Sequence, residues 1–263
     1  MTPGPIPTLG HAVTGSGDRV VLVHGFTQSG ASFDAIANAL AASFEVCTVD
    51  LPGHGGSAEI DGTDLDGTAE LVGAVGGRAI YLGYSLGGRV CLTLALARPD
   101  LVRRLILVGA TPGIADDAER AARRAADERL ADRLAPAGDT AGLAVGTFLD
   151  EWLSQPLFAH LSPAQADRPS RLVNTPAGLA RSLRTAGVGS QIPSHDRLGS
   201  LGMPALLVSG ERDEKFTAIA HAMAAAIGER ATLARVRDAG HAAPFEQPER
   251  FIATVERWLA ETA

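Results

Sequence analysis

A serine, an aspartate and a histidine that can act together on a substrate occur in that order along the chain. Ser85 is the centre of a Gly-Tyr-Ser-Leu-Gly segment, and His241 ends an Asp-Ala-Gly-His loop. A serine hydroxyl becomes a strong nucleophile or base when a histidine takes its proton, and a carboxylate then orients the histidine. Asp213 can supply that carboxylate, although Glu211 and Glu214 compete for the role. The other histidines considered are poorer bases by position: His24, His54, His160, His195 and His221.

The residues around Ser85 predict a sharp turn between a strand and a helix. An apolar run over 79–82 has the length of a buried strand, and residues 89–97 have helical character. Glycines on both sides of the serine allow a strained backbone and a close approach of helix to strand. We therefore expect Ser85 at the apex of a nucleophile elbow, with its hydroxyl at the start of a helix.

The acid and the base each follow a later apolar run of strand length. Asp213 comes after residues 205–210, and His241 comes after residues 232–236. Because catalytic side chains gather at the carboxyl ends of parallel strands, the three residues should meet at one edge of a sheet. Strands are also expected over 19–23, 44–49 and 104–109, and a short edge hairpin within 1–18. Helices are expected over 32–42, 63–75, 218–227 and 248–259.

This alternation of apolar strands with helices predicts an α/β fold with a mostly parallel sheet covered by helices on both faces. The pattern changes between Pro112 and about Pro193, where strand character is missing. Residues 116–134 are charged, rich in alanine and helical in spacing, and 148–153 predict a second helix. We expect a core of residues 1–111 and 199–263, and a helical cap of residues 112–198 inserted into it.

Composition argues against several classes of function. The formal net charge is −7 and no long basic run occurs, which disfavours nucleic acid and anionic membrane surfaces as partners. No apolar run is long enough to span a bilayer, and residues 1–7 lack the basic and apolar parts of a signal peptide. We therefore expect a cytoplasmic location. Cys47 and Cys91 lie in apolar runs and are expected to be buried thiols, and no cluster has zinc-ligand spacing.

Several segments carry a resemblance to a known family. His24-Gly25-Phe26, residues 50–57 (Asp-Leu-Pro-Gly-His-Gly-Gly-Ser) and Ala239-Gly240-His241 are of kinds found throughout the α/β-hydrolase superfamily. More specific are Arg89 behind the elbow, Trp152 with Gln155-Pro156-Leu157-Phe158, and residues 210–216 (Gly-Glu-Arg-Asp-Glu-Lys-Phe). Together these segments resemble the 2-succinyl-6-hydroxy-2,4-cyclohexadiene-1-carboxylate synthases, a family of lyases on the α/β-hydrolase fold.

The resemblance implies an activity. Members of this family eliminate pyruvate from 2-succinyl-5-enolpyruvyl-6-hydroxy-3-cyclohexene-1-carboxylate in menaquinone biosynthesis, without a metal or organic cofactor. By this resemblance the triad acid is Asp213. Ser85 would act as the base that removes a ring proton, made basic by His241 and Asp213. The expected partner is a small polycarboxylate substrate, and the sequence makes no prediction of oligomeric state.

A polycarboxylate needs fixed cations, and arginine pairs with carboxylate through two parallel hydrogen bonds. Arg89 lies one helical turn after Ser85, so it can face the pocket. The resemblance also places Arg120 and Arg171 of the cap at substrate carboxylates, with Arg123 and Arg124 as close neighbours of Arg120. Leu153 stands where the family often has tyrosine. The other expected pocket residues are Tyr84, Trp152, Phe158 and Lys215, with the backbone N–H groups of Phe26 and Leu86 as oxyanion donors.

Two other functions fit parts of the same pattern. One is a carboxylic-ester or carbon–carbon-bond hydrolase with Ser85 as a covalent nucleophile. Several arginines directed at one pocket favour the lyase, because an apolar ester needs none of them. The other is a binding protein without catalysis, and an intact Ser85, Asp213 and His241 argue against it.

Overall fold

The computed structural model describes residues 7–61, 63–135 and 142–262 of the chain. Its centre is a seven-stranded sheet with the strand order β1-β3-β2-β4-β5-β6-β7. Strand β1 is antiparallel to β3, and the other neighbours are parallel. The strands are β1 His11–Gly15, β2 Arg19–Val23, β3 Glu45–Val49, β4 Ala79–Tyr84, β5 Val102–Val108, β6 Ala205–Gly210 and β7 Ala231–Val236.

The N-terminal part corrects one expectation. A short edge hairpin is expected within residues 1–18, but residues 7–18 contain a single strand, β1, which lies at an edge of the sheet and pairs with β3. The loop after β1 therefore crosses to β2, which is in turn parallel to β3. Residues 1–6 of the predicted hairpin lie outside the described part of the chain.

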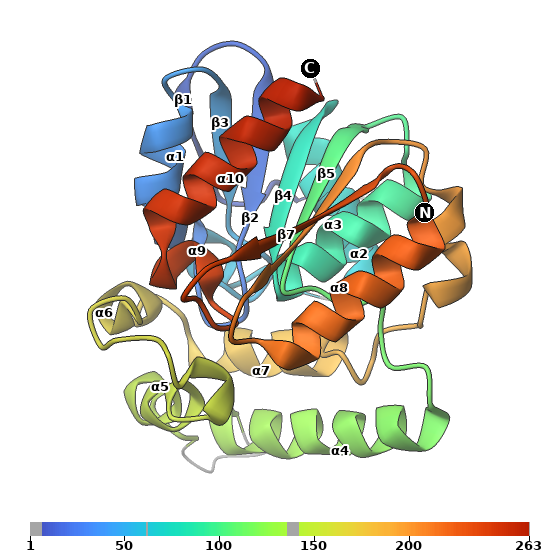
Figure 1. Ribbon diagram of the computed structural model, residues 1–263. Coiled ribbons are helices and arrows are strands. Elements are labelled where there is room, and N and C mark those ends of the chain that lie inside the picture. The colour runs from blue at the N-terminus through green and yellow to red at the C-terminus, as the bar shows by residue number, and fades with distance from the viewer. Residues whose placement is uncertain (1–6, 62, 136–141, 263) are drawn as a thin grey trace, which may run out of the picture.

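Helices cover both faces of the sheet (Figure 1). Helices α1 (Asp34–Leu40) and α10 (Pro248–Glu261) pack on one face, and their apolar residues join one buried cluster. Helices α2 (Leu65–Gly76), α3 (Leu86–Ala97) and α8 (Glu214–Ile227) pack on the other face. A short helix, α9 (Ala243–Glu246), precedes α10.

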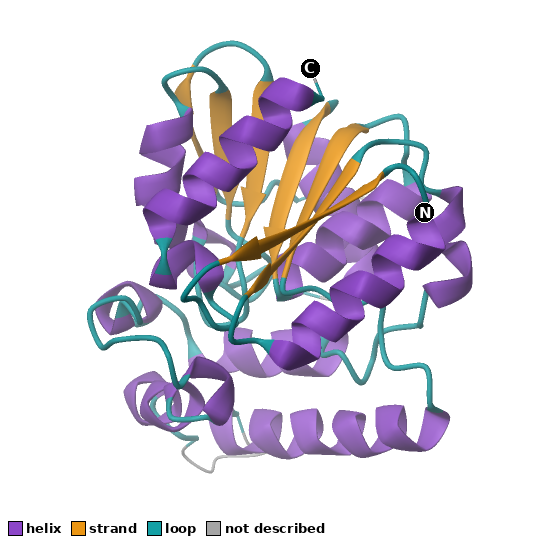
Figure 2. Cartoon of the chain, in the orientation of Figure 1, coloured by secondary structure: helices purple, strands orange, loops and turns teal. Residues whose placement is uncertain are grey.

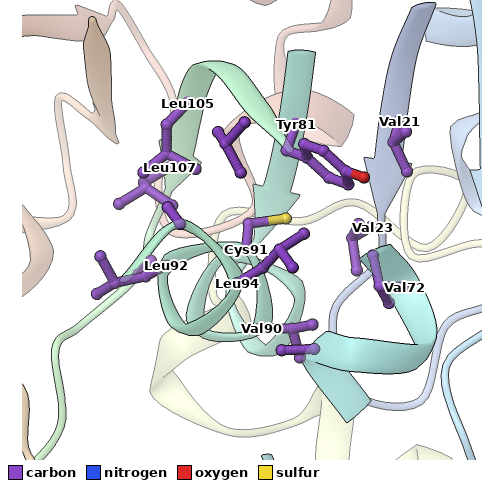
Figure 3. Close-up of a cluster of buried hydrophobic side chains, with 14 of the residues drawn as sticks. Val21, Val23, Val72, Tyr81, Val90, Cys91, Leu92, Leu94, Leu105 and Leu107 are labelled. Carbon is purple, nitrogen blue, oxygen red and sulfur yellow. The ribbon is translucent and has the colours of Figure 1, made fainter. Parts of the chain in front are cut away.

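The central strand β4 shows why both faces need covering. All six of its residues are buried, and its side chains alternate between the two clusters. Tyr81 points to the α3 side, where Figure 3 shows it among Val21, Cys91 and Leu105. Its hydroxyl donates to the Gly77 carbonyl at 2.6 Å, so this large polar side chain is buried without an unpaired group.

Among the described residues between β5 and β6 there are four α-helices. They lie beyond the carboxyl ends of the parallel strands (Figure 2). Their apolar residues, among them Phe148 and Leu179, form a third buried cluster. The helices are α4 Asp117–Leu134, α5 Val145–Leu153, α6 Arg168–Arg171 and α7 Pro176–Ala186. We keep the name cap for this segment. Helix α7 was not expected from the sequence, although Thr175 caps it and Pro176 occupies its first turn.

No helix of the described residues is long and apolar enough to cross a membrane.

Candidate active site

Ser85 occupies the turn between β4 and α3. Its φ of 53° lies in the left-handed region, which is rare for residues other than glycine. Its N–H donates to the Val108 carbonyl at 2.8 Å, and its side chain makes no capping bond to α3. Gly83 and Gly87 make the turn possible, because a Cβ on either would lie 2.3 Å or 2.1 Å from a backbone oxygen. The hydroxyl is therefore presented to the cavity by the elbow that the sequence predicts.

Asp213 and His241 lie beside this hydroxyl. His241 Nδ1 is 2.8 Å from Asp213 Oδ2, and His241 Nε2 is 3.4 Å from Ser85 Oγ. Because an ionised carboxylate only accepts hydrogen bonds, Nδ1 carries the proton and Nε2 is left to accept from the serine hydroxyl. Phe216 N–H donates to the second carboxylate oxygen at 3.1 Å, which fixes the Asp213 side chain at the start of α8. The arrangement can draw a proton from Ser85.

The loop that carries His241 is held by a buried carboxylate. Glu246 accepts from Gly240 N–H at 2.6 Å and from Ala242 N–H at 2.9 Å, one on each side of the histidine. The Phe216 ring packs on the imidazole, with ring centroids 4.4 Å apart. These contacts limit how far the imidazole can rotate away from Ser85.

Two backbone N–H groups are available next to Ser85. Phe26 and Leu86 both line the cavity that contains the serine, and neither N–H donates to another group within the described residues. Leu86 begins helix α3, whose first N–H groups have no partner within the helix. The pair can therefore bind a negative oxygen that develops on a substrate.

The cavity has a volume of about 600 Å³ and lies between the sheet and the cap. Arg89 reaches into it from α3, with only 8% of its surface exposed. Its recorded partner is Gln191 Oε1 at 3.3 Å, and no carboxylate of the described residues pairs with it. Burial and, to a lesser degree, the nearby Arg123 cation lower the pKa of Arg89 to about 10, while the Asp127 carboxylate acts in the opposite direction. A buried cation with no carboxylate in direct contact is costly, so Arg89 favours a negatively charged ligand at this end of the cavity.

Arg123 and Lys215 add positive charge to the same cavity, and Trp152 adds an aromatic wall. Arg123 Nε lies 2.9 Å from Asp127 Oδ1, and the other oxygen of this buried aspartate has no hydrogen-bond partner within the described residues. Trp152 packs against Phe26 with ring centroids 5.0 Å apart. The cavity thus combines these cations and apolar surface with the carboxylates of Asp116, Glu119 and Asp127, and Arg89 is a cation that no carboxylate of the described residues contacts directly.

Four side chains expected in the pocket do not line it. Arg120 turns back to the first turn of its helix, where it pairs with Asp117 and donates to the Ile114 carbonyl at 2.9 Å. Of the three neighbouring arginines, Arg123 is the one that faces the cavity. The remaining three of the four expected side chains are buried outside the cavity. Arg171 lies against Thr27, Tyr84 against Phe245 and His241, and Phe158 against Trp152.

The sequence leaves open which of Arg120, Arg123 and Arg124 faces the pocket, and it does not place Asp127 there. Arg123 and Asp127 are four residues apart on one helix, which is the spacing of an ion pair, and this spacing could have predicted their contact. The rotation of α4 about its axis decides which arginine faces inward, and that rotation depends on packing against α7. Leu153 packs at the edge of the apolar cluster of the cap.

His24 and His54 are fully buried and join the loops around the site. Leu51 N–H donates to His24 Nε2 at 3.0 Å, and Thr27 N–H donates to His54 Nε2 at 3.3 Å. Each ring also lies within bonding distance of a backbone carbonyl through Nδ1, so both imidazoles are neutral with the proton on Nδ1. Burial lowers the pKa of His24 to about 4 and that of His54 to about 3.

This burial predicts a loss of stability in mild acid. Below the ordinary histidine pKa of 6.5 the unfolded chain binds protons at His24 and His54 and the folded chain does not, so unfolding becomes easier as the pH falls. Each histidine should lower the free energy of unfolding by up to about 1.4 kcal/mol per pH unit below that value. Urea titrations between pH 7 and 5 measure this slope. His54→Asn should reduce it, and His221→Gln, on the exposed face of α8, should not. Equal slopes in the parent protein, His54→Asn and His221→Gln would contradict the interpretation of His54 as a buried neutral histidine.

No group of three or more histidine, cysteine, aspartate or glutamate residues in the described ranges is arranged to hold a metal ion. Cys47 and Cys91 are free and buried.

Comparisons with known proteins bear on the family and the fold of the chain. Residues 20–254 match the model of the Alpha/beta hydrolase family. The chain is 33% identical over 248 residues to 2-succinyl-6-hydroxy-2,4-cyclohexadiene-1-carboxylate synthase of Klebsiella pneumoniae, covering 92% of this chain and 93% of the relative. It is 31% identical to the enzyme of the same name from Salmonella typhimurium, covering 91% and 93%.

Two solved structures have the same fold over nearly the whole chain. MenH from S. aureus superposes with a TM-score of 0.87 at 29% identity, covering 96% of this chain and 98% of that one. A thermophilic esterase from Thermogutta terrifontis with bound malate superposes with a TM-score of 0.80 at 27% identity, covering 97% and 93%.

Proposed function

Because the chain belongs to the alpha/beta hydrolase family, and two of its relatives are named 2-succinyl-6-hydroxy-2,4-cyclohexadiene-1-carboxylate synthase, we propose that it eliminates pyruvate from 2-succinyl-5-enolpyruvyl-6-hydroxy-3-cyclohexene-1-carboxylate. The product is 2-succinyl-6-hydroxy-2,4-cyclohexadiene-1-carboxylate, an intermediate of menaquinone biosynthesis. The same fold carries many reactions, so the argument for this one depends on the site and on the relatives together.

The observation that best supports the proposal is the buried Arg89 guanidinium beside Ser85. It enters the cavity from the helix that begins at the elbow, and no carboxylate of the described residues forms an ion pair with it. The proposed substrate carries a carboxylate on the ring, one on the succinyl arm and one on the enolpyruvyl group. Arg89, Arg123 and Lys215 offer cations to these groups.

The chemistry of the substrate explains the serine. The ring proton at C2 is adjacent to the succinyl ketone and is therefore acidic. His241 Nε2 takes the hydroxyl proton as Ser85 Oγ removes the C2 proton. The C–H electron pair becomes the C2–C3 double bond, the ring double bond moves to C4–C5, and the C5–O bond breaks. Enolpyruvate leaves and takes the proton held by His241, which restores the starting state of the enzyme.

The two free N–H groups have a role in the same step. As the proton leaves C2, negative charge spreads onto the ketone oxygen of the succinyl arm. Phe26 and Leu86 N–H can donate to that oxygen at the moment the charge develops, which lowers the barrier. The test of the function is direct: the purified protein is mixed with the enolpyruvyl substrate, and pyruvate is measured with lactate dehydrogenase and NADH.

Loss of a cavity arginine should weaken the reaction with the natural acid. A hydrogen bond to a charged group contributes roughly 1.5–3 kcal/mol, which corresponds to about a 10- to 150-fold change in rate or binding. Arg89→Ala and Arg123→Ala should each lower kcat/KM for pyruvate release by about that factor. Steady-state kinetics over a range of substrate concentrations measures it.

Arg120→Ala is the matched control, because Arg120 is on the same helix as Arg123 and turns away from the cavity. We expect its kcat/KM to stay close to that of the parent enzyme. A loss in Arg120→Ala as large as that in Arg123→Ala would mean that the cap rotates on binding and that the pocket is built differently. A neutral ester such as p-nitrophenyl acetate should be hydrolysed at similar rates by all these variants.

The second candidate function is ester hydrolysis with Ser85 as a covalent nucleophile. The similarity to the Thermogutta terrifontis esterase favours it. The contact of Ser85 with His241 favours it as well, because a covalent serine hydrolase needs the same pair. The two functions differ in what happens to Ser85. Mass spectrometry during turnover should show unmodified protein for the lyase. An acyl adduct on Ser85, with no pyruvate released, would establish the hydrolase.

A further inference from the structure

Thr27 follows Phe26 directly in the loop of residues 24–29, and its backbone is strained. Its φ of 70° lies in the left-handed region, which a β-branched residue rarely adopts. The residue is also completely buried. Such a conformation persists when the surrounding groups hold it in place, and it occurs most often at functional sites.

Each polar group of Thr27 has a partner in another segment. The N–H donates to His54 Nε2 at 3.3 Å, the hydroxyl oxygen accepts from Arg171, and the carbonyl accepts from Asn174 Nδ2 at 2.7 Å. Arg171 and Asn174 come from the cap, at the end of α6 and in the turn before α7 (Figure 1). The cap is thereby fastened to the loop that carries the Phe26 N–H.

The orientation of the Asn174 amide is set by its neighbours. Its Oδ1 accepts from Gly55 N–H at 2.9 Å, and its Nδ2 donates to the carbonyls of both Thr27 and Arg171. A flipped amide would set oxygen against two carbonyls and nitrogen against an N–H, so only one orientation satisfies all three bonds. Only 5% of the surface of Asn174 is exposed, so the loss of one of these bonds leaves a buried polar group unpaired.

A series of hydrogen bonds leads from Asn174 through two peptide groups to the Phe26 N–H. The peptide that contains the Thr27 carbonyl also contains the Gln28 N–H, which donates to the Gly25 carbonyl at 3.2 Å. The Gly25 carbonyl and the Phe26 N–H belong to one trans peptide and point in opposite directions. Hydrogen bonds in series polarise one another, so donation from Asn174 both orients the Phe26 N–H and makes it a stronger donor.

We propose that Asn174 is a positioning residue for the Phe26 N–H, and that the cap completes the oxyanion donor pair of the core through it. Arg171 supports the same loop through the Thr27 hydroxyl. Neither side chain lines the cavity, so both act through Thr27. The inference builds on the proposed function, because the Phe26 N–H acts on charge that develops during the reaction.

Asn174→Asp is the sharpest test. The carboxylate keeps an acceptor for Gly55 N–H, but it sets a negative oxygen against the Thr27 carbonyl in place of a donor. Complete loss of an oxyanion donor costs about 10²–10³-fold in kcat. A misplaced donor should cost less, and we expect kcat for pyruvate release to fall roughly 10- to 100-fold with KM changed by less than about 3-fold. Asn174→Ala, which removes the donor without adding charge, should show the same division between kcat and KM.

Thr175→Ala is the matched control. Thr175 is the next residue, and its hydroxyl caps α7 by accepting from Gly178 N–H at 3.0 Å. The variant loosens the same turn of the cap without touching Thr27. We expect lower thermal stability and an unchanged kcat at a temperature where all variants are folded. An equal loss of kcat in Thr175→Ala and the Asn174 variants would overturn the proposal, because general loosening of the cap would then explain both.

A second readout separates this proposal from the identity of the substrate. A fluorophosphonate modifies an activated serine while its P=O oxygen occupies the oxyanion site, so its rate of reaction with Ser85 does not depend on which substrate is natural. Both Asn174 variants should be labelled at least about 10-fold more slowly than the parent enzyme. If the cap merely opened, the probe would enter more easily and labelling would be faster or unchanged, which would overturn the proposal. If the probe did not label the parent enzyme, the proposal would lose its premise, which is a pair of N–H donors beside a reactive Ser85. Slow labelling of the variants with no pyruvate release by the parent enzyme would support the role of Asn174 and contradict the lyase.

Discussion

Replacing Ser85 with alanine should remove nearly all pyruvate release while the protein remains folded. The hydroxyl oxygen lies 3.4 Å from His241 Nε2 and makes no bond that caps α3, so its loss leaves the elbow intact. Alanine has the same Cβ as serine and meets the same strain at a φ of 53°. A positioned general base contributes about 10²–10⁴-fold, and we expect a loss of kcat in that range, measured with the lactate dehydrogenase assay.

Two measurements keep this result interpretable. Thermal unfolding of Ser85→Ala should match that of the parent enzyme, which excludes loss of the fold as the cause. Substrate should still bind, because the cavity cations are unchanged, and equilibrium binding of the product can be compared in the two proteins. If Ser85→Ala retained more than about a tenth of the parent kcat, a threshold of roughly 1.4 kcal/mol in the barrier, another group would be the base.

The parts of this site that could be predicted from sequence are those fixed by local signals. Ser85 lies between a strand and a helix, with glycines where the backbones approach most closely, and these signals are all within ten residues. Asp213 and His241 follow apolar runs that end at the same edge of the sheet. Parallel pairing then brings the three together, because the register of each strand is set by its buried residues.

The parts that could not be predicted depend on how distant elements pack. Nothing in the sequence distinguishes Arg120, Arg123 and Arg124 as candidates for the cavity. The rotation of α4 against α7 directs Arg123 toward it. The bond between Asn174 and Thr27 joins residues 147 positions apart, and nothing near either residue signals it. Helix α7 was missed for a different reason: Pro176 indicates an interruption in the sequence, whereas proline suits the first turn of a helix. Gly178 in the same turn allows close contact with Gly53.

Exchange of the triad acid should be about as damaging as loss of Ser85. In Asp213→Asn, Phe216 N–H still donates to the side-chain oxygen that now occupies the Oδ1 position, so the new amide group is directed at His241 Nδ1. An amide NH₂ can only donate, and Nδ1 must then accept. The imidazole proton moves to Nε2, which faces Ser85 and can no longer take its proton. We expect kcat to fall by about 10³–10⁴-fold, with KM nearly unchanged.

His241→Ala should produce a loss of similar size, and the double variant should be no worse than the worse single variant. If Asp213 acts only by orienting His241 and holding its proton on Nδ1, removal of the histidine leaves the aspartate with nothing to contribute. Steady-state kcat for the parent, both single variants and the double variant forms a complete cycle. If the logarithms of the two losses of kcat added up in the double variant, Asp213 and His241 would act independently. The proton transfer from Ser85 to His241 would then have to be replaced by a mechanism in which each residue contacts the substrate itself.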